Sequence, residues 1–219
     1  MISLKDGHTG GQMDVWSMTA VERAALVDRL AALDDEQWAA QSLCTGWSVR
    51  DVTGHILAVA SMSTGRFVRG MVGNRFSFER LQSEGIKQQT RKRTNADLVA
   101  ALQAKVDSRA KPPGPSTTVL GETLVHGEDI FRALAGAPLT HPIEHVTTCA
   151  EFYKKNRFPL QVKRRIAGVT LRMTDADWCH GSGPEVSGPG IAILMVMLGR
   201  KAFLPEVQGD GVTILAGRP

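Results

Sequence analysis

The stretch LCTGWSVRDVTGHIL, residues 43–57, decides the fold, because it marks where a helix begins and which face of that helix is apolar. Ser48 and Asp51 have the spacing of a capping box, in which each of the two side chains bonds the other residue's backbone amide. Val52 and Ile56 follow at helical spacing. The stretch therefore predicts an amphipathic helix that begins at Ser48.

His55 lies on the apolar side of this predicted helix. On a wheel of 100° per residue it is about 60° from Val52 and about 40° from Val59, so its imidazole is expected to point toward the core. A histidine among aliphatic side chains is more often hydrogen-bonded within a core than bound to a metal. Taken alone, His55 leaves both interpretations open.

A second helix, expected over residues 117–134, carries Glu122 and His126 four residues apart and therefore on one face. An apolar stripe adjoins that face, and burial of a carboxylate beside it is costly unless something compensates the charge. A hydrogen bond within the pair would do so, and so would a divalent metal. With His55 the pair forms a set of two histidines and one carboxylate, the composition that catalytic zinc uses with a fourth position open.

Four further side chains are candidates for roles around this set. Asp129 shares the face of His126 and is expected to orient either His126 or Arg132 from outside the ligand set. Arg132 and Arg200 are candidates to anchor a substrate carboxylate by paired hydrogen bonds, and a structural ion pair is the alternative for Arg132. Cys44 is either a small buried apolar residue before the helix cap or a reactive thiol near the metal.

The first stretch, preceded by DEQW at residues 35–38, resembles the signature of the mycothiol-dependent maleylpyruvate isomerase family, which belongs to the DinB-like group of four-helix metalloenzymes. ETLVHGEDIFRAL, residues 122–134, is similar to the second motif of that family. Three later segments are similar to the sterol-carrier-like domain that follows the bundle there: GPEVSGP (183–189), LGR (198–200) and GDG (209–211).

The resemblance implies a mainly α plus α+β protein, with a DinB-like four-helix bundle followed by a small sterol-carrier-like α+β domain. It also implies that His55, Glu122 and His126 bind one divalent metal, with zinc as the expected ion. Mycothiol, a low-molecular-weight thiol, would then be the cofactor or cosubstrate. The implied activity is a cis-trans isomerase or a thiol S-transferase that acts on a small electrophile.

The expected domain organisation has three parts: a flexible N-terminal tail over residues 1–14, the helical bundle over residues 15–158, and the small α+β domain over residues 159–219. Within them, Thr19 and Glu22 have capping-box spacing and predict the start of the first helix at Thr19. Residues 74–93 are expected to form a loop or a solvated helix. Residues 212–215 are expected to form a closing strand.

Composition limits the classes of function. The chain has 219 residues, of which 42% are hydrophobic and 22% charged, an ordinary globular balance. Three cysteines without a CxxC motif favour a reducing, cytoplasmic location. The longest apolar run, residues 191–198, is too short for a membrane helix, and no secretory signal is expected.

Several assignments of partner and class remain open. The net charge of +4 favours anionic partners of any size. The basic residues 91–93 are interpreted as solvated surface, and nucleic acid is not an expected partner because no aromatic platform accompanies them. The competing function is a non-catalytic, metal-containing binding protein that holds a small apolar ligand.

Overall fold

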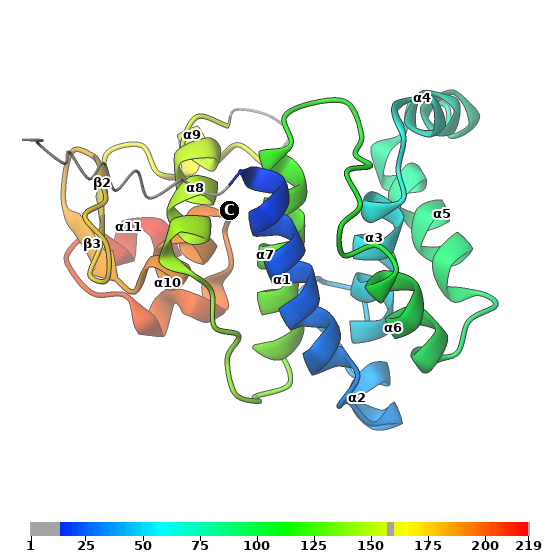
Figure 1. Ribbon diagram of the computed structural model, residues 1–219. Coiled ribbons are helices and arrows are strands. Elements are labelled where there is room, and N and C mark those ends of the chain that lie inside the picture. The colour runs from blue at the N-terminus through cyan, green and yellow to red at the C-terminus, as the bar shows by residue number, and fades with distance from the viewer. Residues whose placement is uncertain (1–13, 157–159, 219) are drawn as a thin grey trace, which may run out of the picture.

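The computed structural model describes residues 14–156 and 160–218. Apart from Asp14, the expected N-terminal tail lies outside the described residues, and so does the expected domain boundary between residues 158 and 159. The described chain forms a helical bundle joined to a smaller lobe of helices and strands, which confirms the predicted mainly α plus α+β class (Figure 1). None of its helices combines the length and the apolar character that crossing a bilayer requires.

The bundle and its flanking helices come first in the chain. Their bounds are α1 (Val15–Leu30), α2 (Asp35–Ala39), α3 (Val49–Ala60), α4 (Thr64–Gly73), α5 (Phe78–Thr90), α6 (Asn95–Gln103), α7 (Thr117–Phe131) and α8 (Ile143–Tyr153). The smaller lobe contains α9 (Val162–Arg165), β1 (Thr170–Met173), β2 (Cys179–Gly181), β3 (Glu185–Gly188), α10 (Gly190–Met197), a 3-10 helix (Lys201–Glu206) and α11 (Val212–Ala216).

Local capping explains where the bundle helices begin. The capping box of Ser48 and Asp51 is present at the start of α3, as predicted. The start predicted at Thr19 is wrong, because α1 begins at Val15, where the Asp14 side chain accepts hydrogen bonds from the first-turn amides. The Thr19 hydroxyl instead donates to the Val15 carbonyl inside the helix.

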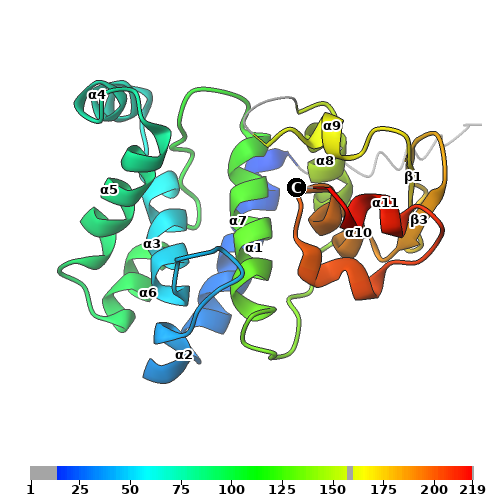
Figure 2. The same cartoon turned by 180° about the vertical axis from the view of Figure 1, so that it is seen from behind.

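Four helices, α1, α3, α6 and α7, pack around one apolar core, and α5 lies against the outer side of α3. Gly54 on α3 permits this approach, because a Cβ at that position would lie 2.7 Å from the Thr90 methyl group of α5. Residues 74–93 are therefore largely helical, and Leu81 and Ile86 of α5 are buried. Figure 2 shows α7 between α3 on one side and the smaller lobe on the other.

The smaller lobe is built on a three-stranded sheet of order β2-β1-β3, in which β1 pairs antiparallel with β2 and parallel with β3. The strand expected over residues 212–215 is wrong, because these residues form the helix α11. The outer edge of β3 already pairs with Gln208 through Ser187, and the amides of Ile214 and Leu215 bond back to the Gly211 carbonyl. A short apolar run of this length fits either structure.

A second apolar core joins the smaller lobe to the bundle. It contains the buried face of α10 together with Leu120 and Leu124 of α7 and Met18 of α1. Helix α8 lies between α7 and α10 and contributes to this core through Val146 and Cys149. The two lobes therefore share packing rather than only a connecting segment.

A buried polar network reinforces that junction. His141 Nδ1 lies 2.7 Å from one Glu22 oxygen, and His141 Nε2 lies 3.1 Å from a Glu128 oxygen. The other Glu22 oxygen is 2.6 Å from His145 Nδ1. Burial alone would lower the pKa of His141, but its bonds to Glu128 and Glu22 outweigh that effect and raise the pKa to about 9. His141 is therefore protonated at neutral pH and ties α1 to α7.

Stability is expected to depend on pH through His141. Because its folded pKa of about 9 exceeds the unfolded value near 6.5, its contribution is complete below pH 6.5 and is lost as the pH rises through 9. The shift corresponds to on the order of 3 kcal/mol. Urea unfolding of the wild type from pH 6 to pH 10 measures this loss, and His141→Gln should show a much flatter profile. Parallel profiles would contradict the assignment.

Candidate metal centre

Two neighbouring bundle helices bring the three predicted ligand residues together. His55 from α3 and Glu122 and His126 from α7 converge, with His55 Nε2 2.9 Å and His126 Nε2 3.2 Å from the same Glu122 oxygen. The two imidazole rings meet edge to face, with their centroids 5.0 Å apart. Helical spacing puts His55 on the inner face of α3, and Glu122 and His126 on the inner face of α7. The packing of α3 against α7 then brings the three side chains together.

The donor set fits a divalent ion. One nitrogen of each histidine and one carboxylate oxygen lie within 4.8 Å of one another. A tetrahedral zinc with bonds of about 2.0–2.1 Å needs donors about 3.3 Å apart, so small side-chain movements suffice. A second group, formed by Cys44, His126 Nδ1 and Asp129, also meets the distance criterion. It suits a cation poorly, because the Arg200 guanidinium already occupies both Asp129 oxygens.

Electrostatics of the cluster show how the protein stabilises the buried carboxylate. Burial alone would raise the pKa of Glu122, but hydrogen bonds from His126 and His55 outweigh it and hold that pKa well below its ordinary value. Burial would likewise lower the pKa of His126, yet its bonds with Asp129, Cys44 and Glu122 raise it well above its ordinary value. Binding of a cation here would displace the proton from the Nε2 side of His126.

Asp129 orients His126 and is itself fully buried. Its Oδ2 lies 3.0 Å from His126 Nδ1 and accepts a hydrogen bond from the Cys44 thiol at 3.2 Å. Arg200 donates to both Asp129 oxygens, at 3.1 and 2.8 Å. Of the two partners that the sequence suggested for Asp129, the structure brings His126 to it and not Arg132.

Arg132 lies apart from the histidine cluster. It forms an ion pair with Glu206 at 2.8 Å, and its guanidinium lies 4.4 Å above the ring of Phe203. It is thus engaged in the structural ion pair that was its alternative interpretation. Arg200, in contrast, lines the same cavity as Glu122 and His126.

That cavity has a volume of about 610 Å³. Residues of the bundle and of the smaller lobe line it, and Glu122 and His126 form part of its wall. Its walls are largely apolar and aromatic. Trp47, from the loop before α3, covers both histidines, with ring centroids 5.1 Å from His55 and 6.3 Å from His126. This indole restricts the access of water to the two imidazoles.

Tyr153 at the end of α8 is a cavity residue that sequence reasoning missed. Its side chain is 4% exposed, and among the described residues its hydroxyl has no hydrogen-bond partner. The ring lies directly over Gly121, where a Cβ would be 2.2 Å from the hydroxyl oxygen. Two features of the sequence could have identified it. Tyr153 is the only tyrosine of the chain, and a glycine stands next to Glu122 inside the predicted helix.

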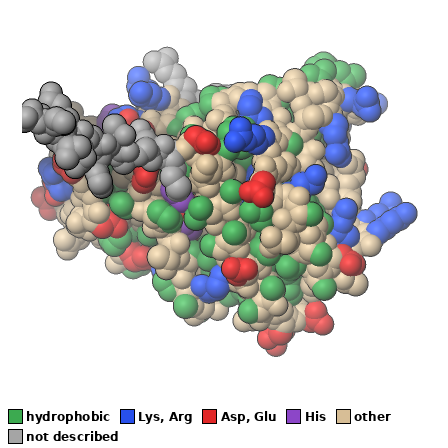
Figure 3. All heavy atoms as spheres, viewed as in Figure 1, with side chains coloured by type: hydrophobic (Ala, Val, Ile, Leu, Met, Phe, Trp, Pro, Cys, Tyr) green, Lys and Arg blue, Asp and Glu red, His purple; other side chains and the backbone are tan. Residues whose placement is uncertain are grey.

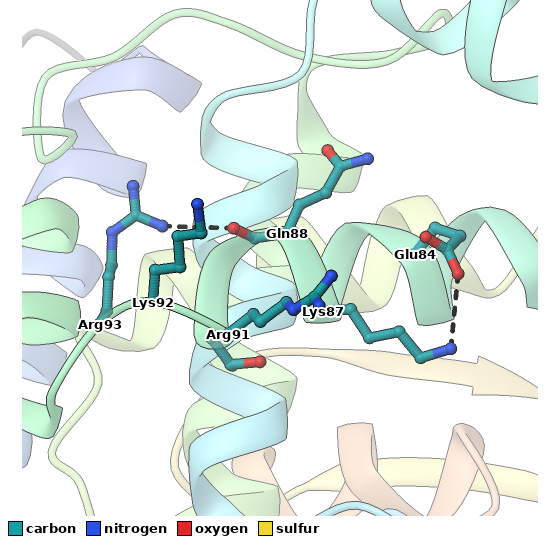
Figure 4. Close-up of a pocket in the computed structure, with 7 residues that line it drawn as sticks. Glu84, Lys87, Gln88, Arg91, Lys92 and Arg93 are labelled. Atoms are coloured by element: carbon teal, nitrogen blue, oxygen red, sulfur yellow. Dashed lines mark hydrogen bonds and ion pairs between the residues drawn. The ribbon is translucent and has the colours of Figure 1, made fainter.

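A second large depression lies far from these residues. Glu84, Lys87, Gln88 and residues 90–93 line it at the end of α5, and Figure 4 shows their long side chains extending over an open surface. Lysine and arginine side chains gather over the same loop in the space-filling view, while exposed apolar side chains gather over α4 (Figure 3). This depression holds no pair of buried titratable groups, so its volume alone does not make it the candidate active site.

The geometry defines a class: a helical bundle with a histidine–glutamate–histidine cluster beneath a cavity that a small C-terminal lobe helps to close. Residues 19–114 match the family model described as the mycothiol maleylpyruvate isomerase N-terminal domain, a range that includes His55 and ends before Glu122. This part of the chain is therefore similar to the N-terminal domain of that family.

Solved structures extend the likeness in fold to both lobes. A crystal structure of the mycothiol-dependent maleylpyruvate isomerase is 16% identical, with a TM-score of 0.63 and coverage of 90% of this chain and 91% of the other. A mutant of that enzyme, with a histidine changed to alanine, gives 15% identity, a TM-score of 0.62 and the same coverage. No curated protein sequence matches the chain. At these identities the structures show the fold alone.

The Asp129–Arg200 pair should be essential for stability. In Asp129→Asn the guanidinium loses its charge partner while it remains largely buried, so we expect a loss of about 3–5 kcal/mol in the free energy of unfolding. Glu206→Gln is the matched control, because it breaks the half-exposed pair with Arg132 and should cost under about 1 kcal/mol. Similar urea midpoints for the two variants would contradict this ranking.

Gly121→Ala should disturb the cavity through Tyr153. The added methyl group would overlap the phenol, so we expect the ring to move and the protein to lose about 1–3 kcal/mol of stability. Gly65→Ala in α4 is the control, because a Cβ there meets no atom within 4 Å. Denaturant unfolding and the NMR signals of the single tyrosine, labelled on its ring, measure the effect, and unchanged ring signals would show that the ring has not moved.

Proposed function

We propose that this protein is a metal-dependent enzyme that uses a low-molecular-weight thiol, mycothiol, as an isomerase or S-transferase acting on a small electrophile. The observation that carries the proposal is the convergence of His55, Glu122 and His126, of which Glu122 and His126 line a cavity formed by both lobes. Its support from known proteins is the match of residues 19–114 to the family model and a likeness in fold that extends over both lobes.

His55, Glu122 and His126 would hold the ion, with zinc as the proposed metal. When bound, a divalent cation at this place would favour the thiolate form of a thiol that reaches it. Other residues of the chain orient and cover the ligand residues. Asp129 keeps a proton on Nδ1 of His126 and so directs Nε2 toward Glu122, while Trp47 covers both imidazoles.

Positioning must supply most of the acceleration. A free thiol with a pKa of about 8.5 is about 3% ionised at pH 7, so full ionisation gains about 30-fold. The accompanying fall in pKa weakens the sulfur nucleophile by about 10-fold. The net gain is small, whereas alignment of two reactants in a closed cavity can contribute several kcal/mol. The walls of the cavity therefore matter as much as the three ligand residues.

The two outcomes, isomerisation and transfer, share their first step. The thiolate sulfur adds to a carbon of the double bond. In an isomerase the resulting single bond rotates and the thiolate leaves again, whereas in a transferase the adduct takes a proton and is released. The ligand residues are the same in both cases.

Metal binding tests the proposed site directly. Purified wild-type protein loaded with zinc should retain about one ion per chain, and His55→Ala should bind zinc at least about 100-fold more weakly. His180→Ala, which changes a partly exposed histidine on β2, is the matched control and should bind as the wild type does. Equal zinc content in wild type and His55→Ala would contradict the ligand assignment.

Thiol binding then separates an enzyme from a binding protein. Calorimetry should show that mycothiol binds the zinc-loaded wild type and not the zinc-free protein, and an electrophile should be turned over only when the thiol is present. Zinc-loaded protein that binds no mycothiol would overturn the proposed enzyme. It would favour the alternative of a metal-containing protein that holds an apolar ligand.

A further inference from the structure

The walls of the cavity describe the molecule that fits beside the thiol. Aromatic and aliphatic side chains from both lobes form most of the surface, namely Trp47, Phe67, Phe78, Val125, Phe152 and Leu198. Pro112, Pro113 and Pro115 add a rigid apolar rim before α7. Burial of apolar ligand surface against such walls is favourable, and polar groups then set orientation.

The charges of the cavity do not suit a dianion. Among the described residues that line it, Arg200 is the one lysine or arginine. Its guanidinium donates to both oxygens of Asp129 and to the Leu198 carbonyl, so its charge is already balanced and its Nε–Nη2 edge is occupied. Lys201 lines a neighbouring depression instead. Once Glu122 and the thiolate balance the charge of the proposed ion, a ligand carboxylate finds no unpaired cation among the described lining residues, so the loss of its hydration is costly.

The Tyr153 hydroxyl is a polar group of the cavity to which no described residue hydrogen-bonds. The Tyr153 hydroxyl lies over Gly121, beside Glu122, with its ring almost completely buried. The hydroxyl reaches the cavity, so a ligand that hydrogen-bonds it there is oriented by that bond. Burial raises the pKa of Tyr153 well above its ordinary value, with the nearby Glu122 carboxylate acting in the same direction. The phenol therefore keeps its proton and can donate it to an acceptor oxygen.

Resting on the proposed thiol chemistry, we infer that the electrophile is an uncharged, largely apolar carbonyl compound whose carbonyl oxygen accepts a hydrogen bond from Tyr153. An enone is the simplest example. As the carbon–sulfur bond forms at the β-carbon, the electron pair of the carbon–carbon double bond moves toward the carbonyl oxygen, which faces the Tyr153 hydroxyl. In transfer, the α-carbon then takes a proton from water; in isomerisation, the pair returns and the carbon–sulfur bond breaks.

Binding of unreactive analogues tests the charge preference without any turnover. Methyl 3-benzoylpropanoate and 3-benzoylpropanoate share an aryl ketone, lack the reactive double bond and differ in charge. Calorimetry with the zinc-loaded wild type saturated with mycothiol, so that the thiol fills the open metal position, should show at least 10-fold tighter binding of the ester. Equal or tighter binding of the carboxylate would overturn the inference.

Tyr153→Phe tests the hydroxyl and keeps the ring. It should weaken binding of the ester by about 3- to 10-fold. It should also slow the mycothiol-dependent reaction of methyl 3-benzoylacrylate, relative to the uncatalysed addition, by about 10- to 100-fold. Benzyl bromide, which lacks an acceptor oxygen, should react equally well with both proteins. Wild-type rates for the ketone, or an equal loss with benzyl bromide, would overturn the role of Tyr153.

The two levels of the proposal fail in different ways. If the wild type binds the ester selectively and Tyr153→Phe weakens that binding, but mycothiol neither binds nor reacts, the thiol enzyme is wrong and the assigned ligand class stands. If mycothiol reacts but the carboxylate form of the acrylate is preferred, the thiol enzyme stands and the ligand class is wrong. Should Tyr153→Phe fail to fold, the comparison of ester with acid in the wild type still decides the charge preference.

Discussion

The candidate site depends on one buried carboxylate, Asp129. It accepts two hydrogen bonds from Arg200, bonds His126 Nδ1 and accepts from the Cys44 thiol, so three segments far apart in the chain meet on a single side chain. A buried ion pair stabilises a fold only when its hydrogen bonds offset the loss of hydration. Here they do so at the place where α7 meets the smaller lobe. The orientation of His126 and the docking of the lobe are therefore not independent.

The parts of this structure that follow from local rules could be predicted from sequence. The capping boxes at Ser48 and Thr94 and the helical spacing of Glu122 and His126 depend on residues a few positions apart. The pairing of Asp129 with Arg200 spans 71 residues, and no local pattern chooses Arg200 over Arg132. The same limit applies to residues 212–215, whose apolar pattern fits strand or helix until the edge of β3 is seen to be taken.

Tyr153 could not be identified from sequence for a different reason. Its proposed role depends on a side chain that Gly121 lacks and on a hydrogen-bond partner that its hydroxyl lacks among the described residues. A glycine at position 121 leaves room for the phenol against α7, and no residue that the structure describes hydrogen-bonds the hydroxyl, which leaves it available to a ligand. Sequence alone gives both residues but not their contact. Helix α8 brings them together because it packs on α7 and on α10, so the smaller lobe shapes the cavity as much as the bundle does.

A shared fold and a shared ligand set do not fix the electrophile. In the proposed enzyme, the cluster of His55, Glu122 and His126 would determine where a thiol is activated, and the charges around it would determine which substrate that thiol meets. Arg200 would attract an anionic substrate if its partner were absent, but Asp129 holds it as part of the scaffold. In the proposed enzyme, the preference for an ester over its acid would then depend on whether a cation in the cavity wall lacks a charge partner. In the proposed enzyme the choice of substrate would therefore depend on whether Arg200 is engaged by Asp129, with the same three ligand residues in either case.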